Sequence, residues 1–91
     1  MSEVLDQSFV ITNRLGMHAR AATKFVQTAQ RFACDVEVEK DGQTVNGKSI
    51  MGLLMLVAAQ GTSIRICTRG ADARLALEAL GKLIENKFGE T

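Results

Sequence analysis

Segments with the periodicity of a β-strand alternate with segments of helical periodicity along this chain, and their order restricts the folds available to it. Apolar residues at every second position indicate half-buried strands, whereas apolar residues spaced three and four apart indicate amphipathic helices. The strand-like segments are residues 8–13, 36–39, 44–45 and 62–68, and the helical segments are residues 19–31, 50–59 and 72–88. The predicted order of elements is therefore β-α-β-β-α-β-α.

Strands with one apolar face and helices with one apolar stripe pack together in two layers. We therefore expect an α/β (α+β) fold: a two-layer open-faced sandwich with a four-stranded antiparallel sheet and three helices on one face. Asp41-Gly42 favours a tight hairpin between the second and third strands. Gly16 supplies the permissive backbone for a sharp turn into the first helix. Residues 1–91 are expected to form a single domain.

Composition argues against several classes of function. A net charge of +1 and an aromatic content of 4%, all phenylalanine, provide neither the charge nor the stacking surface typical of nucleic-acid binding. The most apolar run, residues 50–59, is shorter than the roughly 20 residues that span a bilayer. Two separated cysteines and a single histidine predict no metal site and no cofactor. We expect a cytoplasmic protein that binds neither membrane nor nucleic acid.

His18 is the only histidine, and it lies where the first predicted helix begins. A helix start presents backbone N–H groups without intrahelical acceptors and the positive end of the helix dipole, which together favour a bound anion. Imidazole is a competent nucleophile near neutral pH, and the guanidinium of Arg20 can donate two parallel bonds to a phosphate. The alternative is an ordinary exposed histidine beside a solvated arginine. Because the chain has neither a recognisable catalytic triad nor a Walker-type loop, His18 fits a carrier better than a catalyst.

Ser49 precedes the second predicted helix and is expected to cap it, a role typically worth about 1 kcal/mol relative to alanine. A phosphate on this hydroxyl would be tolerated by the same free N–H groups. It would add about −1.5 to −2 charges to the surface. The sequence therefore makes Ser49 a candidate electrostatic switch as well as a cap.

The second predicted helix, residues 50–59, is apolar on all sides. We expect one stripe of this helix to face the sheet, formed by Leu53, Leu56 and Val57. A second set would then face elsewhere and form a protein-docking surface, namely Ile50, Met51 and Leu54. The alternative is that the faces of so short a helix are wrongly assigned.

Two motifs, the predicted order of elements and the length of 91 residues together resemble one family. The motifs are Gly16-Met17-His18-Ala19-Arg20 and Lys48-Ser49-Ile50-Met51-Gly52. The chain is similar over nearly its whole length to HPr, the histidine-containing phosphocarrier of the bacterial sugar phosphotransferase system. The resemblance implies that His18 accepts a phosphoryl group on Nδ1 from phosphorylated enzyme I and passes it to sugar-specific acceptor domains. Arg20 would steady the phosphate.

The same resemblance implies further roles and partners. Ser49 matches the serine that HPr kinase/phosphorylase phosphorylates in many bacteria. The loop expected to contact the phosphate contains Gly16, Ala19 and Ala21. The residues expected to dock partners are Thr23, Gln27, Lys48, Ile50, Met51 and Leu54. We expect a monomer.

The chain departs from the family pattern at two positions. Ala21 stands where many members have proline, so its N–H is an extra donor that we expect to contact the phosphate or a nearby water. Leu15 stands where several members have asparagine or serine, so one side-chain contact to phosphate is missing here. Retention of the phosphate would then rely on backbone groups and Arg20.

Two alternatives of different kinds remain open. One is a paralogous phosphocarrier of nitrogen-related or regulatory relays, although the motif around Ser49 favours the sugar and carbon-regulation branch. The other is a pure binding module that acts on a transcription regulator through phosphorylated Ser49 while His18 stays idle. Phosphorylation of His18 by phosphoenolpyruvate and a general enzyme I would indicate a carrier, and its absence would indicate the binding module.

Overall fold

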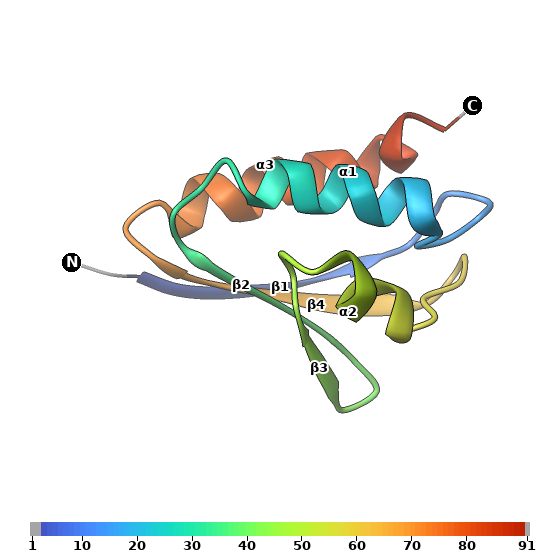
Figure 1. The fold of residues 1–91 in the computed structure, drawn as a ribbon, viewed down its shortest axis with the longest axis horizontal. Helices are drawn as coiled ribbons and strands as arrows, with labels where there is room; N and C mark the ends of the chain where they lie inside the picture. Colours follow the sequence, from blue (N-terminus) through green and yellow to red (C-terminus); the bar gives the residue numbers. More distant parts are fainter. Residues whose placement is uncertain (1–2, 91) are drawn as a thin grey trace.

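The computed structural model describes residues 3–90 and contains four strands, three α-helices and one short 3₁₀ turn (Figure 1). In chain order these elements are β1 (Glu3–Val10), α1 (Ala19–Ala29), β2 (Asp35–Lys40), β3 (Gln43–Asn46), α2 (Ile50–Met55), β4 (Ser63–Gly70), α3 (Ala73–Glu85) and η1 (Lys87–Gly89). The predicted order β-α-β-β-α-β-α is confirmed.

The strands form one antiparallel sheet in the order β1-β4-β2-β3, so β4 pairs with both β1 and β2. Phe9 of β1 lies opposite Ile64, and Val38 of β2 lies opposite Ile66, which places apolar side chains of neighbouring strands together. The hairpin between β2 and β3 turns at Asp41 and Gly42, whose φ angles of 51° and 83° are both positive, as a type I′ turn requires.

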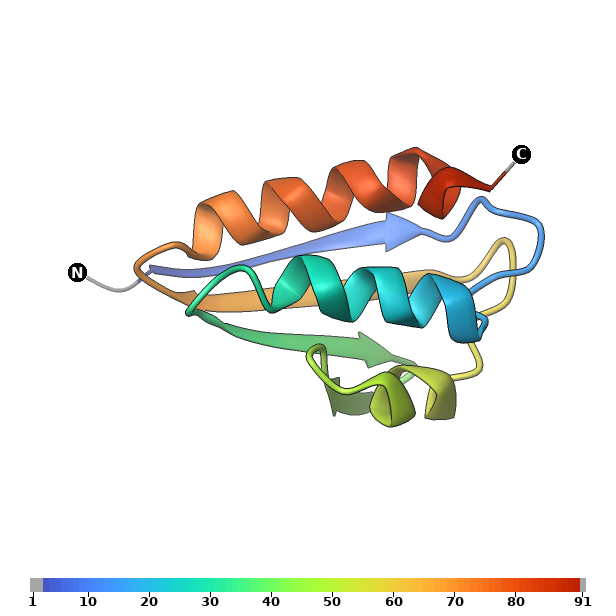
Figure 2. The same ribbon diagram turned by 45° about the horizontal axis from the view of Figure 1, so that its top comes forward.

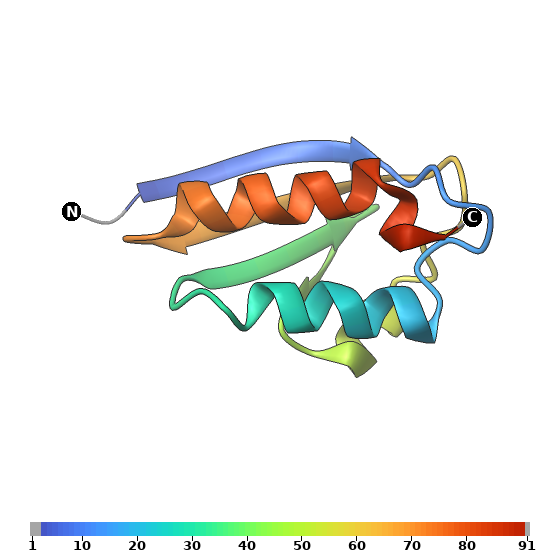
Figure 3. The same ribbon diagram turned by 90° about the horizontal axis from the view of Figure 1, so that it is seen from above.

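Helices α1 and α3 lie side by side over one face of the sheet, as Figures 1 and 3 show from the side and from above. The shorter α2 lies beside α1 and contacts β3 (Figure 2). The largest buried side chains come from helices and sheet alike, including Phe25, Leu53, Ile64, Ile66, Leu80 and Ile84. The two-layer open-faced sandwich is therefore confirmed.

The other face of the sheet is mostly polar, although Val4 and Val10 are exposed on it. Arg65 pairs there with Asp6 at 3.2 Å and with Glu39 at 3.5 Å, and all three side chains are at least partly exposed.

Cys67 is half-buried and Cys34 is buried, and both are free thiols. Within residues 3–90, no helix has the length and apolar character needed to cross a membrane.

The bounds of several elements differ from the sequence-based expectation, and β1 begins at Glu3 rather than Ser8. Strand β1 ends at Val10 rather than near Asn13, because the chain turns there to exchange backbone hydrogen bonds between Ile11 and the loop at Gly61–Thr62. Helix α1 ends at Ala29 rather than Arg31. Helix α3 ends at Glu85, so Phe88 is buried from a separate turn rather than from the helix.

The largest correction concerns α2, which ends at Met55 rather than Ala59. Leu56 and Val57 close the helix with hydrogen bonds to carbonyls three residues back, and Val57 then adopts a left-handed φ of 50°. Leu53 and Leu56 are buried as expected, but Val57 is 75% exposed and does not face the sheet. The helix stops early because the chain beyond it bends to meet the loop that precedes His18.

Candidate functional site

His18 is the N-cap residue of α1. Its backbone is extended, with φ −77° and ψ 177°, and its carbonyl oxygen accepts a 2.9 Å hydrogen bond from the N–H of Ala22. Its side chain is 29% exposed. The predicted position of the imidazole at a helix start is confirmed, and the ring can be reached from solvent.

Gly16 sets the path of the loop that leads to His18. Its φ of 68° is left-handed, and a Cβ atom there would lie only 2.5 Å from the carbonyl oxygen of Ala58. The next N–H along the chain, that of Met17, donates a 2.8 Å bond to this same oxygen. The loop before His18 is therefore fixed to the segment that follows α2.

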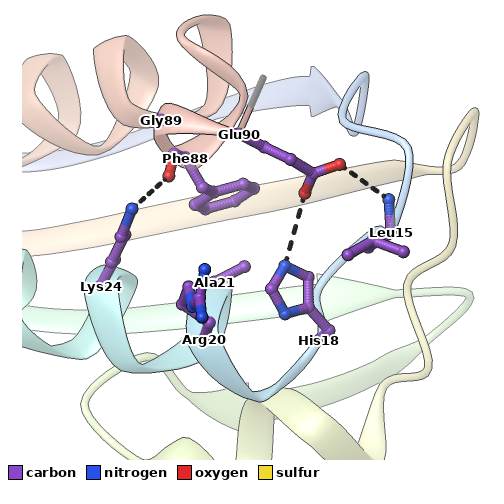
Figure 4. A pocket seen from close by; sticks show the side chains of 8 residues that line it. All are labelled: Leu15, His18, Arg20, Ala21, Lys24, Phe88, Gly89 and Glu90. Atoms are coloured by element: carbon purple, nitrogen blue, oxygen red, sulfur yellow. Dashed lines mark hydrogen bonds and ion pairs between the residues drawn. The ribbon is translucent and has the colours of Figure 1, made fainter.

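A cavity of about 70 Å³ opens beside the imidazole (Figure 4). Its walls are Leu15, His18, Arg20, Ala21, Lys24, Phe88, Gly89 and Glu90. Arg20 is exposed, and within residues 3–90 its guanidinium takes part in none of the ion pairs, so it can receive an anion. His18 and Arg20, which the sequence placed together at the start of the first helix, therefore line one small cavity.

Glu90 is a site residue that sequence reasoning missed. Its Oε1 accepts a 3.1 Å hydrogen bond from the N–H of Leu15, and its Oε2 accepts one of 3.0 Å from Nδ2 of Asn13. The same Oε2 lies 3.4 Å from Nε2 of His18 (Figure 4). The hydrogen bond from Asn13 is the main reason why the pKa of the Glu90 carboxyl lies below its ordinary value, with smaller contributions from Leu15 and His18.

The turn η1 carries Glu90 to the imidazole. Lys87, Phe88 and Gly89 all have left-handed φ angles, of 56°, 56° and 74°. Such a conformation is unfavourable for the two residues that are not glycine. Burial of the Phe88 ring stabilises the turn, as does a 2.7 Å hydrogen bond from the Lys24 ammonium to the Phe88 carbonyl.

No sequence signal reveals this arrangement. Asn13 and Glu90 are 77 positions apart, and neither belongs to a recognisable motif. Asn13 is fully buried, and its Nδ2 also donates a 2.7 Å bond to the carbonyl of Gly16. A polar side chain in the loop after a strand is ordinary in a sequence, so only its burial in the fold shows its role.

Ser49 caps α2 as predicted. Its Oγ accepts a 3.0 Å hydrogen bond from the N–H of Gly52, and the side chain is half-buried. The neighbouring Lys48 was expected to dock partners, but its ammonium donates a 2.7 Å bond to the carbonyl of Phe32. Lys48 therefore also anchors the loop that follows α1.

Large apolar side chains are exposed on α2 and next to it. The three that were expected are Ile50 at 37%, Met51 at 73% and Leu54 at 37%. Met55, Val57 and Leu15 extend this set, with exposures of 62%, 75% and 64%. We call these six residues the α2 patch. The link from Met17 to Ala58 holds its two segments together, next to the loop that carries His18.

The other predicted contact residues lie on α1. Ala19 is exposed at its first turn, whereas Ala21 is fully buried and lines the cavity. Thr23 is half-buried, with its hydroxyl donating to the carbonyl of Ala19 at 2.8 Å, and Gln27 is exposed one turn further on. Their roles toward phosphate and partners stay predictions.

Comparisons with known proteins show which family the chain belongs to. Residues 5–86 match the family described as "PTS HPr component phosphorylation site". The phosphocarrier protein HPr of Neisseria meningitidis is 55% identical over 87 residues, which cover 96% of this chain and 98% of that protein. The HPr-like protein Crh of Bacillus subtilis is 40% identical over 84 residues, covering 92% of this chain and 99% of Crh.

Solved structures are similar over the same length. The crystal structure of HPr-C-His from Thermoanaerobacter tengcongensis superimposes with a TM-score of 0.92 at 45% identity, covering 96% of this chain and 98% of that chain. The crystal structure of an HPr dimer from the same organism has a TM-score of 0.77 at 48% identity, covering 90% of this chain and 94% of that chain. The chain belongs to the HPr family of phosphocarrier proteins of the phosphotransferase system.

Proposed function

We propose that His18 carries the phosphoryl group. The observation that supports this most strongly is the partly exposed imidazole at the start of α1, with Arg20 lining the same cavity. Phosphoryl transfer needs positioning and charge stabilisation more than covalent chemistry from the protein. The free N–H groups of the first turn and Arg20 would supply both to a phosphate on Nδ1.

The partners would be phosphorylated enzyme I as donor and sugar-specific acceptor domains as recipients, in the cytoplasm. Both would bind the α2 patch together with Thr23 and Gln27 on the neighbouring α1, since an exposed apolar surface next to the reacting group can serve donor and acceptor alike. Partners that share one surface must bind in turn, which suits a carrier.

Ser49 would act as a regulatory switch that HPr kinase/phosphorylase phosphorylates. Its hydroxyl lies at the start of α2, where a phosphate would add negative charge beside the α2 patch. Docking of an acidic partner surface would then be opposed.

The test is incubation with phosphoenolpyruvate and a general enzyme I. We expect a heat- and acid-labile label that His18→Ala abolishes and that forms more slowly on Ser49→Asp. Absence of label from the parent protein would refute the carrier role and favour a binding module that acts through Ser49. Equal rates for the parent protein and Ser49→Asp would refute the switch alone.

A further inference from the structure

The two ring nitrogens of His18 have different surroundings. Nε2 lies 3.4 Å from Oε2 of Glu90, and Figure 4 shows the other ring nitrogen on the side of the imidazole turned away from that carboxylate. An ionised carboxylate only accepts hydrogen bonds. The contact is therefore favourable only when Nε2 carries a proton, and a neutral imidazole that carries its proton on Nε2 has its lone pair on Nδ1.

We propose that Glu90 is a positioning residue that keeps the proton on Nε2, so that His18 presents Nδ1 as its nucleophile. This assignment rests on the proposed role of His18 as phosphoryl acceptor, and it deepens that role by naming the group that selects the reacting atom.

The consequence for the reaction is that no proton has to move on His18. When Nδ1 attacks phosphorus, the N–P bond forms with the nitrogen lone pair, and the electron pair of the broken bond stays with the donor. The ring, still protonated on Nε2, becomes a cation, and the Glu90 carboxylate faces its charge. When the phosphoryl group passes on, the electron pair returns to Nδ1 and neutral imidazole departs, which is a better leaving group than imidazolate.

A separation of 3.4 Å is long for a hydrogen bond, and such contacts in an unliganded site shorten when charge develops. The structure holds the carboxylate ready for this. Asn13 and Leu15 donate to its two oxygens, and only 19% of the Glu90 side chain is exposed. These bonds orient both oxygens, so the direction of Glu90 toward the ring does not depend on His18 alone.

The test uses phosphoramidate, a small phosphoryl donor that does not need the docking surface. The parent protein, Glu90→Gln and Glu90→Ala are each treated with it, and the two phosphohistidine isomers are separated and counted. Glu85→Gln is the matched control, because Glu85 is exposed at the end of α3 and its substitution removes the same charge. Nitrogen-15 spectra of the unphosphorylated proteins report directly which ring nitrogen carries the proton.

We expect label on Nδ1 and a proton on Nε2 in the parent protein and in Glu85→Gln. In both Glu90 variants the ratio of Nε2 to Nδ1 product should rise roughly tenfold, the effect of losing one hydrogen bond to a charged group. Unchanged isomer ratios and an unchanged proton position in folded Glu90 variants would overturn the proposal. Failure of the parent protein to be labelled on His18 at all would instead refute the carrier role on which it rests.

Discussion

The ammonium of Lys24 donates a 2.7 Å hydrogen bond to the carbonyl oxygen of Phe88, so the first helix holds the turn that carries Glu90. Lys24→Met should lower the free energy of unfolding by about 1–2 kcal/mol, since a bond from a charged donor is lost while the aliphatic part of the side chain is kept. Urea denaturation measures this. Lys82→Met, at an exposed lysine of α3, should cost roughly 0.5 kcal/mol or less, and an equal loss in both variants would contradict a specific role for Lys24.

Gly16 and Gly42 allow the cost of a left-handed backbone to be separated from the cost of a clash. Both have positive φ, but an added Cβ at Gly16 would meet the Ala58 carbonyl at 2.5 Å, whereas nothing lies within 4 Å at Gly42. Gly42→Ala should cost about 1–2 kcal/mol, and Gly16→Ala at least about 1 kcal/mol more. Thermal or urea unfolding compares the two. Equal costs would show that the approach of Gly16 to Ala58 is not tight in solution.

The cap and the proposed switch at Ser49 respond differently to two substitutions. Ser49→Ala removes the acceptor for the Gly52 N–H and should cost about 1 kcal/mol of stability. Ser49→Asp keeps an acceptor at the cap and adds a charge, so it should keep most of the stability while slowing labelling of His18 by enzyme I. A similar loss of stability in both variants would mean that slow labelling of Ser49→Asp reflects a damaged helix.

Met51 tests the α2 patch, because it is 73% exposed and contributes little to the core. Met51→Glu should leave the unfolding free energy within about 0.5 kcal/mol of the parent protein while raising the KM for labelling by enzyme I. Leu75→Glu is the control, since Leu75 is 61% exposed on α3, outside the patch. Equal KM values for both variants would place the docking surface elsewhere.

Acid should weaken the fold through two carboxylates. The pKa of Glu90 lies below its ordinary value of 4.5, chiefly because of the bond from Asn13, and the pKa of Asp72 lies below 3.8, chiefly because of the bond from the Ala33 N–H. A carboxyl group whose pKa is lowered by folding stabilises the folded state fully when the pH is above its ordinary pKa. This stabilisation is lost as the pH falls through the lowered pKa of the folded state.

The stability curve of the parent protein should therefore fall below about pH 4.5, the ordinary value for Glu90. Asp72→Asn and Glu90→Gln should each be less stable at pH 7 and flatter below this point, as thermal melts at several pH values would show. If the stability curve of either variant ran parallel to that of the parent protein, the carboxylate it lacks would not contribute to the acid sensitivity. Glu85→Gln serves again as the control.

Periodicity was sufficient to predict the order of elements and the two-layer arrangement, because the period of each strand or helix depends on residues close in sequence. It failed at the end of α2. The expected helix reaches residue 59, whereas the helix ends at Met55 and the Ala58 carbonyl accepts a hydrogen bond from the Met17 N–H. Such a bond between distant segments has no local signature, and it overrides the helical preference of the apolar run that ends at Ala59.

The site residues likewise fall into those that local sequence predicts and those that depend on contacts between distant segments. His18, Arg20 and Ser49 lie at helix starts, which local sequence marks. Asn13 and Glu90 become site residues only because η1 folds back on the loop before α1, and that path depends on two left-handed residues for which sequence provides no turn signal. Sequence therefore predicts the reacting group, whereas its surroundings require the structure.

The position of Glu90 also separates the fold from the surroundings of the histidine. Residue 90 follows every strand and helix described here, and Lys87 is exposed in η1. Proteolytic cleavage after Lys87 would therefore remove the carboxylate while leaving the residues of all four strands and three α-helices in one chain. The imidazole would then face solvent without its acidic neighbour.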